Sequence, residues 1–196
     1  MDWIEQLAQF KPWKPSLVPP VGLKKSAVLV PLQFRNGSLH VIMTVRSRNL
    51  SRYSGDISFP GGMQDPDDGG DFIKTALREA EEEISLPPQK VRVLCQLRPC
   101  MTQHEIIVVP VIGFIDDESF EPIANLNEVE ECFRIRIESV LSESIIWKTI
   151  QVQQRIPYNV LYLNTVCSIG TERRVWGVTA NIFILLLILG GRLLQP

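Results

Sequence analysis

The chain has 196 residues, of which 45% are hydrophobic and 21% are charged, and its formal net charge is −2. These values are typical of a globular protein with one sizeable core. They exclude the broad positive charge that drives non-specific binding to nucleic acid or to an anionic membrane, so we expect neither partner. A phosphate site in this chain must depend on a local basic cluster or on a bound cation.

Cysteine and histidine usage excludes two further classes of site. The cysteines follow no paired spacing, which predicts free thiols and argues against a zinc site or a disulfide framework. With only two histidines in the chain, we do not expect a catalytic histidine triad. The four cysteines are Cys95, Cys100, Cys132 and Cys167.

The first 22 residues are predicted to form an N-terminal arm, and residues 23–196 to form one domain. Prolines punctuate the arm, so we expect a short helix followed by extended chain. Asp2 and Glu5, and the lack of a continuous apolar run, argue against a secretory signal. The prolines are Pro12, Pro15, Pro19 and Pro20.

A β-hairpin is predicted after the arm. Ser26–Arg35 and Leu39–Arg46 are rich in β-forming residues, and Asn36-Gly37 between them is the pair that two-residue hairpin turns favour. The stretch from Arg46 to Pro60 is polar and irregular, which predicts a loop. Gly61-Gly62 and the acidic, glycine-rich residues 65–70 indicate further turns.

The strongest helical pattern runs from about Asp71 to Ile84, and Pro87-Pro88 would end it. At 3.6 residues per turn its apolar side chains fall on one stripe, which we expect to face the core. These side chains are Ile73, Ala76, Leu77, Ala80 and Ile84.

The second half of the chain continues with strands. Val91–Arg98 and Ile106–Ile115 are predicted strands, while Leu141–Ile150 and Tyr158–Asn164 carry weaker strand patterns. A last helix is predicted from about Thr179 to Leu189. Strands around one strongly marked helix, with another helix at the end, predict an α+β fold in which a mixed β-sheet lies between helices, an α/β/α sandwich.

The apolar run Val178–Leu189 raises the question of a membrane anchor. It spans about a dozen residues and contains Asn181, whereas a crossing helix needs about 20 apolar residues. A buried helix is therefore predicted. The alternative, anchoring by this run, would appear as detergent-dependent solubility.

Three glutamates of the helix predicted over residues 71–84 suggest a metal site. Glu79, Glu82 and Glu83 stand at i, i+3 and i+4, so their carboxylates lie on one face. Like charges at this spacing cost roughly 0.2–0.5 kcal/mol per pair, and the helix dipole favours cations there. A divalent cation removes both penalties. Arg78 is placed to hold the Glu82 carboxylate, and a solvated acidic face is the competing interpretation.

Residues 78–86 read Arg-Glu-Ala-Glu-Glu-Glu-Ile-Ser-Leu and resemble the Nudix box, whose second half is Arg-Glu-apolar-x-Glu-Glu-x-Gly-apolar. The resemblance implies the Nudix fold and Mg²⁺ or Mn²⁺ bound by Glu79, Glu82 and Glu83. It also implies an orienting role for Arg78 and a substrate loop at Gly61-Gly62.

This chain departs from the Nudix box in two places. Ser85 replaces the family's glycine, so either a left-handed serine costs about 1 kcal/mol or a different cap forms near Pro87. The loop from Gly62 to Arg78 is longer, and an acidic group stands where a glutamate is usual. That group is Asp65, Asp67 and Asp68.

A narrower resemblance precedes the box. Residues 43–47 (Met-Thr-Val-Arg-Ser), Leu50, Gly55 and residues 58–62 (Ser-Phe-Pro-Gly-Gly) resemble the segment before the box in coenzyme A diphosphatases. Those enzymes split CoA into 3′,5′-ADP and 4′-phosphopantetheine. The resemblance implies hydrolysis of CoA or acyl-CoA, with Arg46 and Arg52 on the phosphates. Ordinary exposed loop arginines are the competing interpretation.

The resemblance leaves several properties open. The proton acceptor for the attacking water is either Glu82 or Glu128, and Glu128 also fits an acidic surface turn. A Nudix hydrolase of another nucleoside diphosphate derivative, or a silent nucleotide-binding Nudix domain, is an alternative. A homodimer is compatible with the family. Related animal enzymes imply an intracellular, peroxisomal or mitochondrial location, although the final residues 193–196 are not a Ser-Lys-Leu signal.

Overall fold

A hairpin and a parallel partner strand form the centre of the protein. The structure, a computed structural model, describes residues 22–50, 53–102, 104–141, 145–150, 158–167 and 170–189. β1 (Lys24–Arg35) and β2 (Ser38–Arg46) pair antiparallel. Asn36 and Gly37 both have positive φ, 51° and 74°, as this two-residue turn requires. β7 (Ile106–Ile115) runs parallel to β1, and the predicted hairpin is confirmed.

Further strands extend this centre into an eight-stranded mixed sheet. Its main path is β3-β2-β1-β7-β5, with β4 on β1, β6 on β7 and β8 on β2. The predicted loop over residues 46–60 therefore contains one short strand. The additional strands are β3 (Ile57–Ser58), β4 (Gly61–Met63), β5 (Val91–Gln96), β6 (Cys100–Met101) and β8 (Val129–Arg136).

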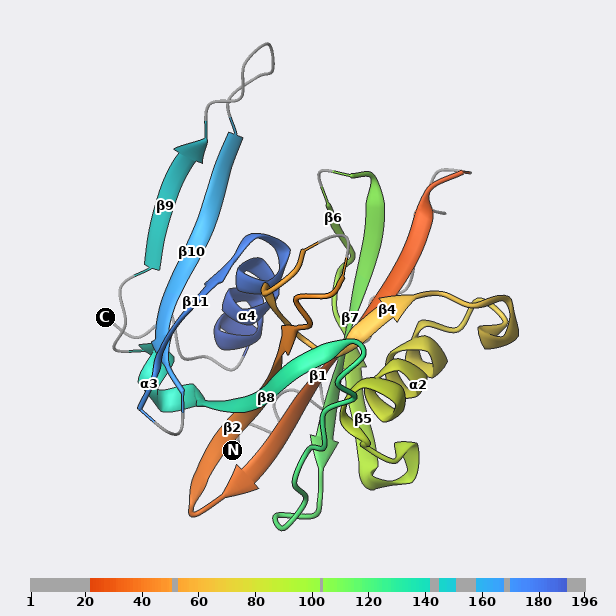
Figure 1. Ribbon diagram of the computed structural model, residues 1–196, viewed down its shortest axis with the longest axis horizontal. Helices are drawn as coiled ribbons and strands as arrows, with labels where there is room; N and C mark the ends of the chain where they lie inside the picture. The colour runs from red at the N-terminus through yellow and green to blue at the C-terminus, as the bar shows by residue number, and fades with distance from the viewer. Residues whose placement is uncertain are drawn as a thin grey trace.

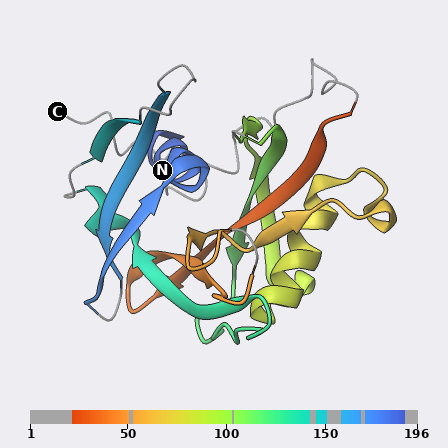
Figure 2. The same cartoon turned by 45° about the horizontal axis from the view of Figure 1, so that its top comes forward.

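Helices cover opposite faces of this sheet (Figures 1 and 2). β1 alternates between two cores: Ala27 and Leu29 pack with α2 (Phe72–Ile84), whereas Val30 and Leu32 share a core with α4 (Gly177–Leu189). The predicted α+β sandwich is confirmed, and so are the helices predicted over residues 71–84 and 179–189. The short helices are η1 (Pro66–Asp68), η2 (Pro88–Lys90) and α3 (Ile137–Leu141).

A second, three-stranded sheet lies beyond α4 (Figure 1). Its order is β11-β10-β9, with β9 (Ile145–Ile150), β10 (Tyr158–Val166) and β11 (Glu172–Trp176). The weaker strand patterns of the sequence correspond to β9 and β10, whereas β11 and β8 were not predicted.

The structure also tests the predictions for the last helix, α4, and for the cysteines. Most residues of the middle of α4 are buried, as predicted for a core helix, and none of the described helices has the length and apolar character needed to span a membrane. All four cysteines are free thiols. The N-terminal arm up to residue 21 and Arg52 lie outside the described residues.

The end of α2 keeps the left-handed cap of the family pattern with a serine in place of glycine. The Asp71 side chain caps the start of the helix by accepting from the Ile73 N–H at 2.8 Å. At the other end Ser85 has φ 55° and ψ 35°, and its N–H donates to the Glu81 carbonyl at 3.0 Å. Of the two alternatives left by the sequence, the strained serine is therefore the one that forms.

We expect Ser85→Gly to raise the free energy of unfolding by about 1 kcal/mol, because glycine has no Cβ to strain in the left-handed region. Urea unfolding measures the change. The long contact from Ser85 Oγ to the Ile123 carbonyl, 3.4 Å at an exposed position, contributes little. Ser85→Ala removes the same hydroxyl but keeps the Cβ. A glycine variant no more stable than this alanine variant would contradict the backbone explanation.

Candidate active site

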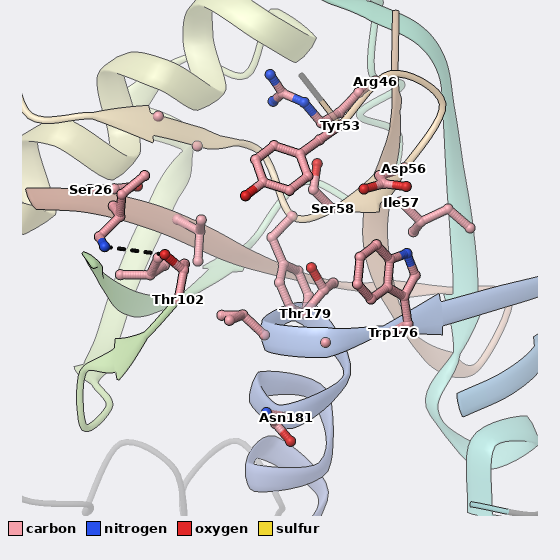
Figure 3. Close-up of a pocket in the computed structure, with 18 of the residues that line it drawn as sticks. Ser26, Arg46, Tyr53, Asp56, Ile57, Ser58, Thr102, Trp176, Thr179 and Asn181 are labelled. Atoms are coloured by element: carbon pink, nitrogen blue, oxygen red, sulfur yellow. Dashed lines mark hydrogen bonds between the residues drawn. The ribbon is translucent and has the colours of Figure 1, made fainter. Parts of the chain in front are cut away.

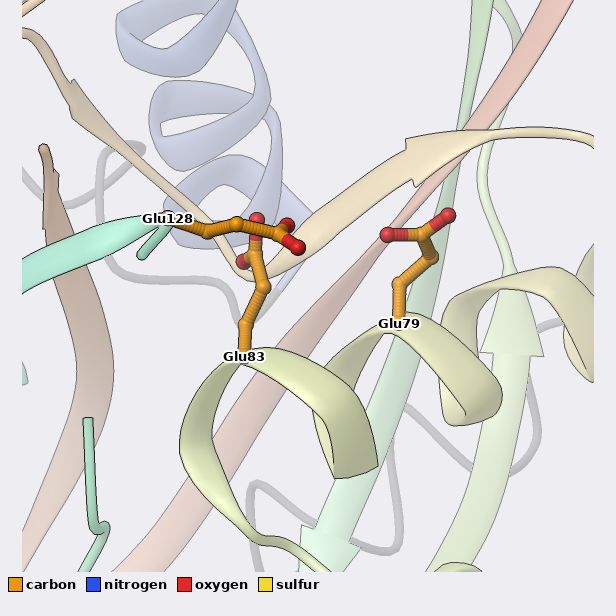
Figure 4. Close-up of side chains that lie close together, drawn as sticks. All are labelled: Glu79, Glu83 and Glu128. Atoms are coloured by element: carbon orange, nitrogen blue, oxygen red, sulfur yellow. The ribbon is translucent and has the colours of Figure 1, made fainter. Parts of the chain in front are cut away.

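Three carboxylates from two distant segments converge beside Gly61 and Gly62 of β4 (Figure 4). Glu79 and Glu83 lie one turn apart on α2, and Glu128 precedes β8. One carboxylate oxygen of each lies within 4.8 Å of the others. The backbone fixes Glu128, because its carbonyl accepts from the Ser47 N–H at 2.8 Å and its own N–H donates to the Asn125 carbonyl at 2.9 Å. We call these three residues the carboxylate trio.

Burial disfavours the charged form of two carboxylates of the trio. Glu83 is only 3% exposed, and this burial raises its pKa to about 8, although a hydrogen bond from the Gly61 N–H at 3.2 Å and the charge of Arg46 oppose the shift. Burial likewise raises the pKa of Glu79, against the pull of the neighbouring Arg78. A cluster of carboxylate oxygens, of which those of Glu83 are buried and the others half-buried, is the kind of donor set that a hard divalent cation compensates. The residues present therefore fit such an ion.

Glycines are required where β4 passes between β1 and the trio. A Cβ on Gly61 would lie 2.4 Å from the Ala27 carbonyl oxygen, and a Cβ on Gly62 would lie 2.3 Å from Glu79 Oε2. At Gly61 the clash is with backbone, so no side chain fits, whereas a side chain at Gly62 would have to displace the Glu79 carboxylate from the trio. Gly61 and Gly62 belong to strand β4 and not to the turn predicted from the sequence, because they pair with β1. The strand brings backbone directly against the carboxylates.

Arg78 ties the loop before α2 to the helix. Its Nε donates to Asp68 Oδ1 and its Nη2 to Asp68 Oδ2, both at 3.1 Å, and the Asp68 side chain is 1% exposed. Asp68 also accepts from Thr75 Oγ1 at 2.8 Å and from the Asp65 N–H at 2.9 Å. The guanidinium holds the pKa of Asp68 well below its usual range, and Asp68 raises the pKa of Arg78.

The same guanidinium reaches two of the helix glutamates. Arg78 Nη1 lies 2.9 Å from Glu79 Oε1 and donates to both Glu82 oxygens at 3.2 and 3.3 Å. The Glu82 side chain is 50% exposed and does not join the trio. Of the three helix glutamates expected to share one site, the structure brings Glu79 and Glu83 together and adds Glu128.

Sequence reasoning did not single out Asp68 as the partner of Arg78. The acidic residues of the loop looked equivalent, because no helical or strand period relates them to α2. One signal was readable: Asp65 and Asp68 form a capping box, in which the Asp65 side chain accepts from the backbone of Asp68 while Asp68 accepts from the Asp65 N–H.

A cavity of about 440 Å³ (Figure 3) includes in its lining Gly61 and Gly62, the two residues that lie against Glu83 and Glu79. Arg46 lines it as well. Arg46 Nε is buried and has no hydrogen-bond partner within the described part of the chain. A guanidinium that lies beside the carboxylates, and whose buried Nε bonds to none of the described residues, is suited to binding an anionic ligand.

Comparisons with known proteins agree with this geometry. A model of the NUDIX domain matches residues 23–152. Peroxisomal coenzyme A diphosphatase NUDT7 of Mus musculus is 41% identical over 124 residues, which cover 63% of this chain and 52% of that protein. Mitochondrial coenzyme A diphosphatase NUDT8 of Mus musculus is 39% identical over 161 residues, covering 80% of this chain and 73% of that protein. The chain spans about half the length of several curated relatives that it matches.

One solved structure supports the fold alone. A MutT/nudix family protein from Enterococcus faecalis has a TM-score of 0.53 at 15% sequence identity, over 88% of this chain and 64% of that chain.

Proposed function

Because the chain belongs to the NUDIX domain family, we propose that it hydrolyses the diphosphate bond of coenzyme A or acyl-CoA, giving 3′,5′-ADP and 4′-phosphopantetheine or its acyl derivative. The observation that carries the proposal is the carboxylate trio within 4.8 Å, next to Gly61, Gly62 and Arg46, whose Nε has no hydrogen-bond partner among the residues that the structure describes. The names of the two mouse relatives supply the substrate.

Glu79, Glu83 and Glu128 would hold the metal, Mg²⁺ or Mn²⁺. Their oxygens are hard donors, and the buried Glu83 between two other acids favours a cation over an empty site. When bound, such an ion polarises the diphosphate and lowers the pKa of a coordinated water. Glu82, which we also expected among the ligands, accepts hydrogen bonds from Arg78 with both oxygens. It would therefore help to orient Arg78 and would not be one of the three ligands.

The neighbouring residues would bind and orient the substrate. Arg46 would pair with the phosphate oxygens, and the two glycines let the diphosphate approach the backbone closely. Arg52, which follows Arg46 in the sequence and lies outside the described residues, is proposed as a second phosphate contact. Between the two candidate proton acceptors, we favour Glu128 over Glu82. One Glu128 oxygen would hold the metal and its second oxygen would be left to accept the proton, whereas both Glu82 oxygens accept from Arg78.

The proposed partner of the protein is a small molecule. CoA or acyl-CoA is the partner, without nucleic acid or membrane, and a homodimer is compatible with it. By likeness to the peroxisomal and mitochondrial mouse relatives, we propose one of these two organelles as the location.

We expect 3′,5′-ADP and 4′-phosphopantetheine to appear when the protein is incubated with CoA and Mg²⁺, and neither product to appear with a chelator. Chromatography of the products measures both. A parallel panel of ADP-ribose, NADH and diadenosine polyphosphates identifies the preferred substrate. Faster cleavage of any of these compounds than of CoA would overturn CoA as the proposed substrate. Saturable binding without turnover in Mg²⁺ or Mn²⁺ would support a silent nucleotide-binding domain.

A further inference from the structure

The cavity reaches the start of α4, where Trp176, Thr179 and Asn181 line it (Figure 3). Its lining begins at Gly61 and Gly62, and it ends at the segment Trp176–Asn181, which carries the last strand into the first turn of α4. A substrate whose diphosphate lies at the trio would therefore extend one of its two arms into this space.

Aromatic contacts hold the two ends of the cavity in place. Phe59, two residues before Gly61, stacks on Phe183 of α4 with ring centroids 6.2 Å apart. Trp176 stacks on Tyr162 of β10 with centroids 6.5 Å apart. Both ends are thus attached to packed elements, which gives the cavity a defined length.

The chemistry of the lining discriminates between the two arms of CoA. Apolar side chains from β1, β7, β10 and α4 form the walls, and hydroxyl groups such as those of Ser58 and Thr179 interrupt them. Two charged residues line it within the described part of the chain, Arg46 and Asp56, and their charges are opposite.

The nucleotide arm carries a separate 3′-phosphate, which would need cations of its own to be buried. Arg46 lies beside the trio and would already be paired with the diphosphate. The Asp56 carboxylate would repel a further phosphate. The pantetheine arm is uncharged, and its two amides and its aliphatic groups match isolated polar groups on apolar walls.

We propose that this cavity binds the pantetheine arm, that the 3′-phosphorylated nucleotide stays outside it, and that Thr179 is a specificity-determining residue. This rests on the proposed function. Thr179 stands in the first turn of α4, half-buried, and points into the cavity beside Trp176 (Figure 3). A larger side chain there fills the space that the arm occupies.

The test measures binding of the two product halves in the presence of Mg²⁺ by titration calorimetry. Thr179→Trp is expected to weaken binding of 4′-phosphopantetheine by about tenfold or more and to leave binding of 3′,5′-ADP within about twofold. Ile188→Trp is the matched control: it lies on the same helix, is 40% exposed and does not line the cavity, so both affinities should be unchanged. Thr179→Leu is the second variant, should the tryptophan prevent folding.

Three outcomes overturn the proposal: a loss confined to 3′,5′-ADP, an equal loss for both ligands, and no loss for either. The first would place the nucleotide in the cavity. No turnover is needed for this measurement. A wild-type protein that binds 4′-phosphopantetheine in the cavity but does not cleave CoA would therefore refute the proposed function and leave this assignment intact.

Discussion

Replacing Glu83 with glutamine is expected to lower kcat/KM for CoA by about three orders of magnitude, because a catalytic cation contributes several kcal/mol and each 1.4 kcal/mol is worth tenfold. Glutamine keeps the shape of the side chain and removes one charge from the carboxylate trio, so the protein should remain folded. Initial rates at saturating Mg²⁺, together with the Mg²⁺ dissociation constant, measure the effect.

The matched control is Glu81→Gln, which removes the same charge from an exposed position on the same helix. Its kcat/KM should stay within about twofold of the wild type, as for a surface charge. A Glu83→Gln variant that retains more than about a tenth of the activity would contradict the ligand role.

The same substitution has a signature in the metal-free protein. The pKa of Glu83 is raised from 4.5 to about 8 in the folded state, so between these values the folded chain binds more protons than the unfolded chain. The contribution of Glu83 to the free energy of unfolding is then fully present below pH 4.5. It is lost as the pH rises through 8, with a slope of at most about 1.4 kcal/mol per pH unit. Glu83→Gln should flatten this part of the curve. Chelated wild-type protein whose stability stays constant from pH 5 to 8 would contradict it.

The predictable parts of the fold are those whose signal is local. The Asn36-Gly37 turn and the apolar stripe of α2 depend on neighbours within a few residues, and the structure contains both. β8 and β11 were missed because each carries charged residues that break the alternation. Their strand state comes from long-range partners, β2 for β8 and β10 for β11.

The candidate site divides in the same way. Helical spacing alone places Glu79 next to Glu83. Glu128 joins them only because β8 pairs with β2, where Val129 lies opposite Arg46. The local sequence of neither strand predicts that register. The position of Glu82 depends on the rotamer that Arg78 selects. The cavity combines strands and a helix from both halves of the chain, so no single motif encodes it.

Arg78→Met is expected to lower the free energy of unfolding by about 3 kcal/mol, which corresponds to a fall in Tm of about 6–12 °C for a chain of this size. Methionine replaces the aliphatic stem of the arginine but leaves Asp68, 1% exposed, without its guanidinium partner. The remaining donors, Thr75 Oγ1 and the Asp65 N–H, do not supply a positive charge. Urea and thermal unfolding of the metal-free protein measure the loss.

Two further variants separate the pair from its surroundings. Arg78→Lys keeps the charge and loses the planar fork that donates to both Asp68 oxygens, so it should recover only part of the stability. Arg78→Met combined with Asp68→Asn removes the buried charge, and its loss should be smaller than the sum of the single losses. If Arg78→Met costs less than about 1 kcal/mol and the losses add, the pair behaves like an ordinary surface salt bridge. The connection between the acidic loop and α2 would then have to come from the backbone and the capping box.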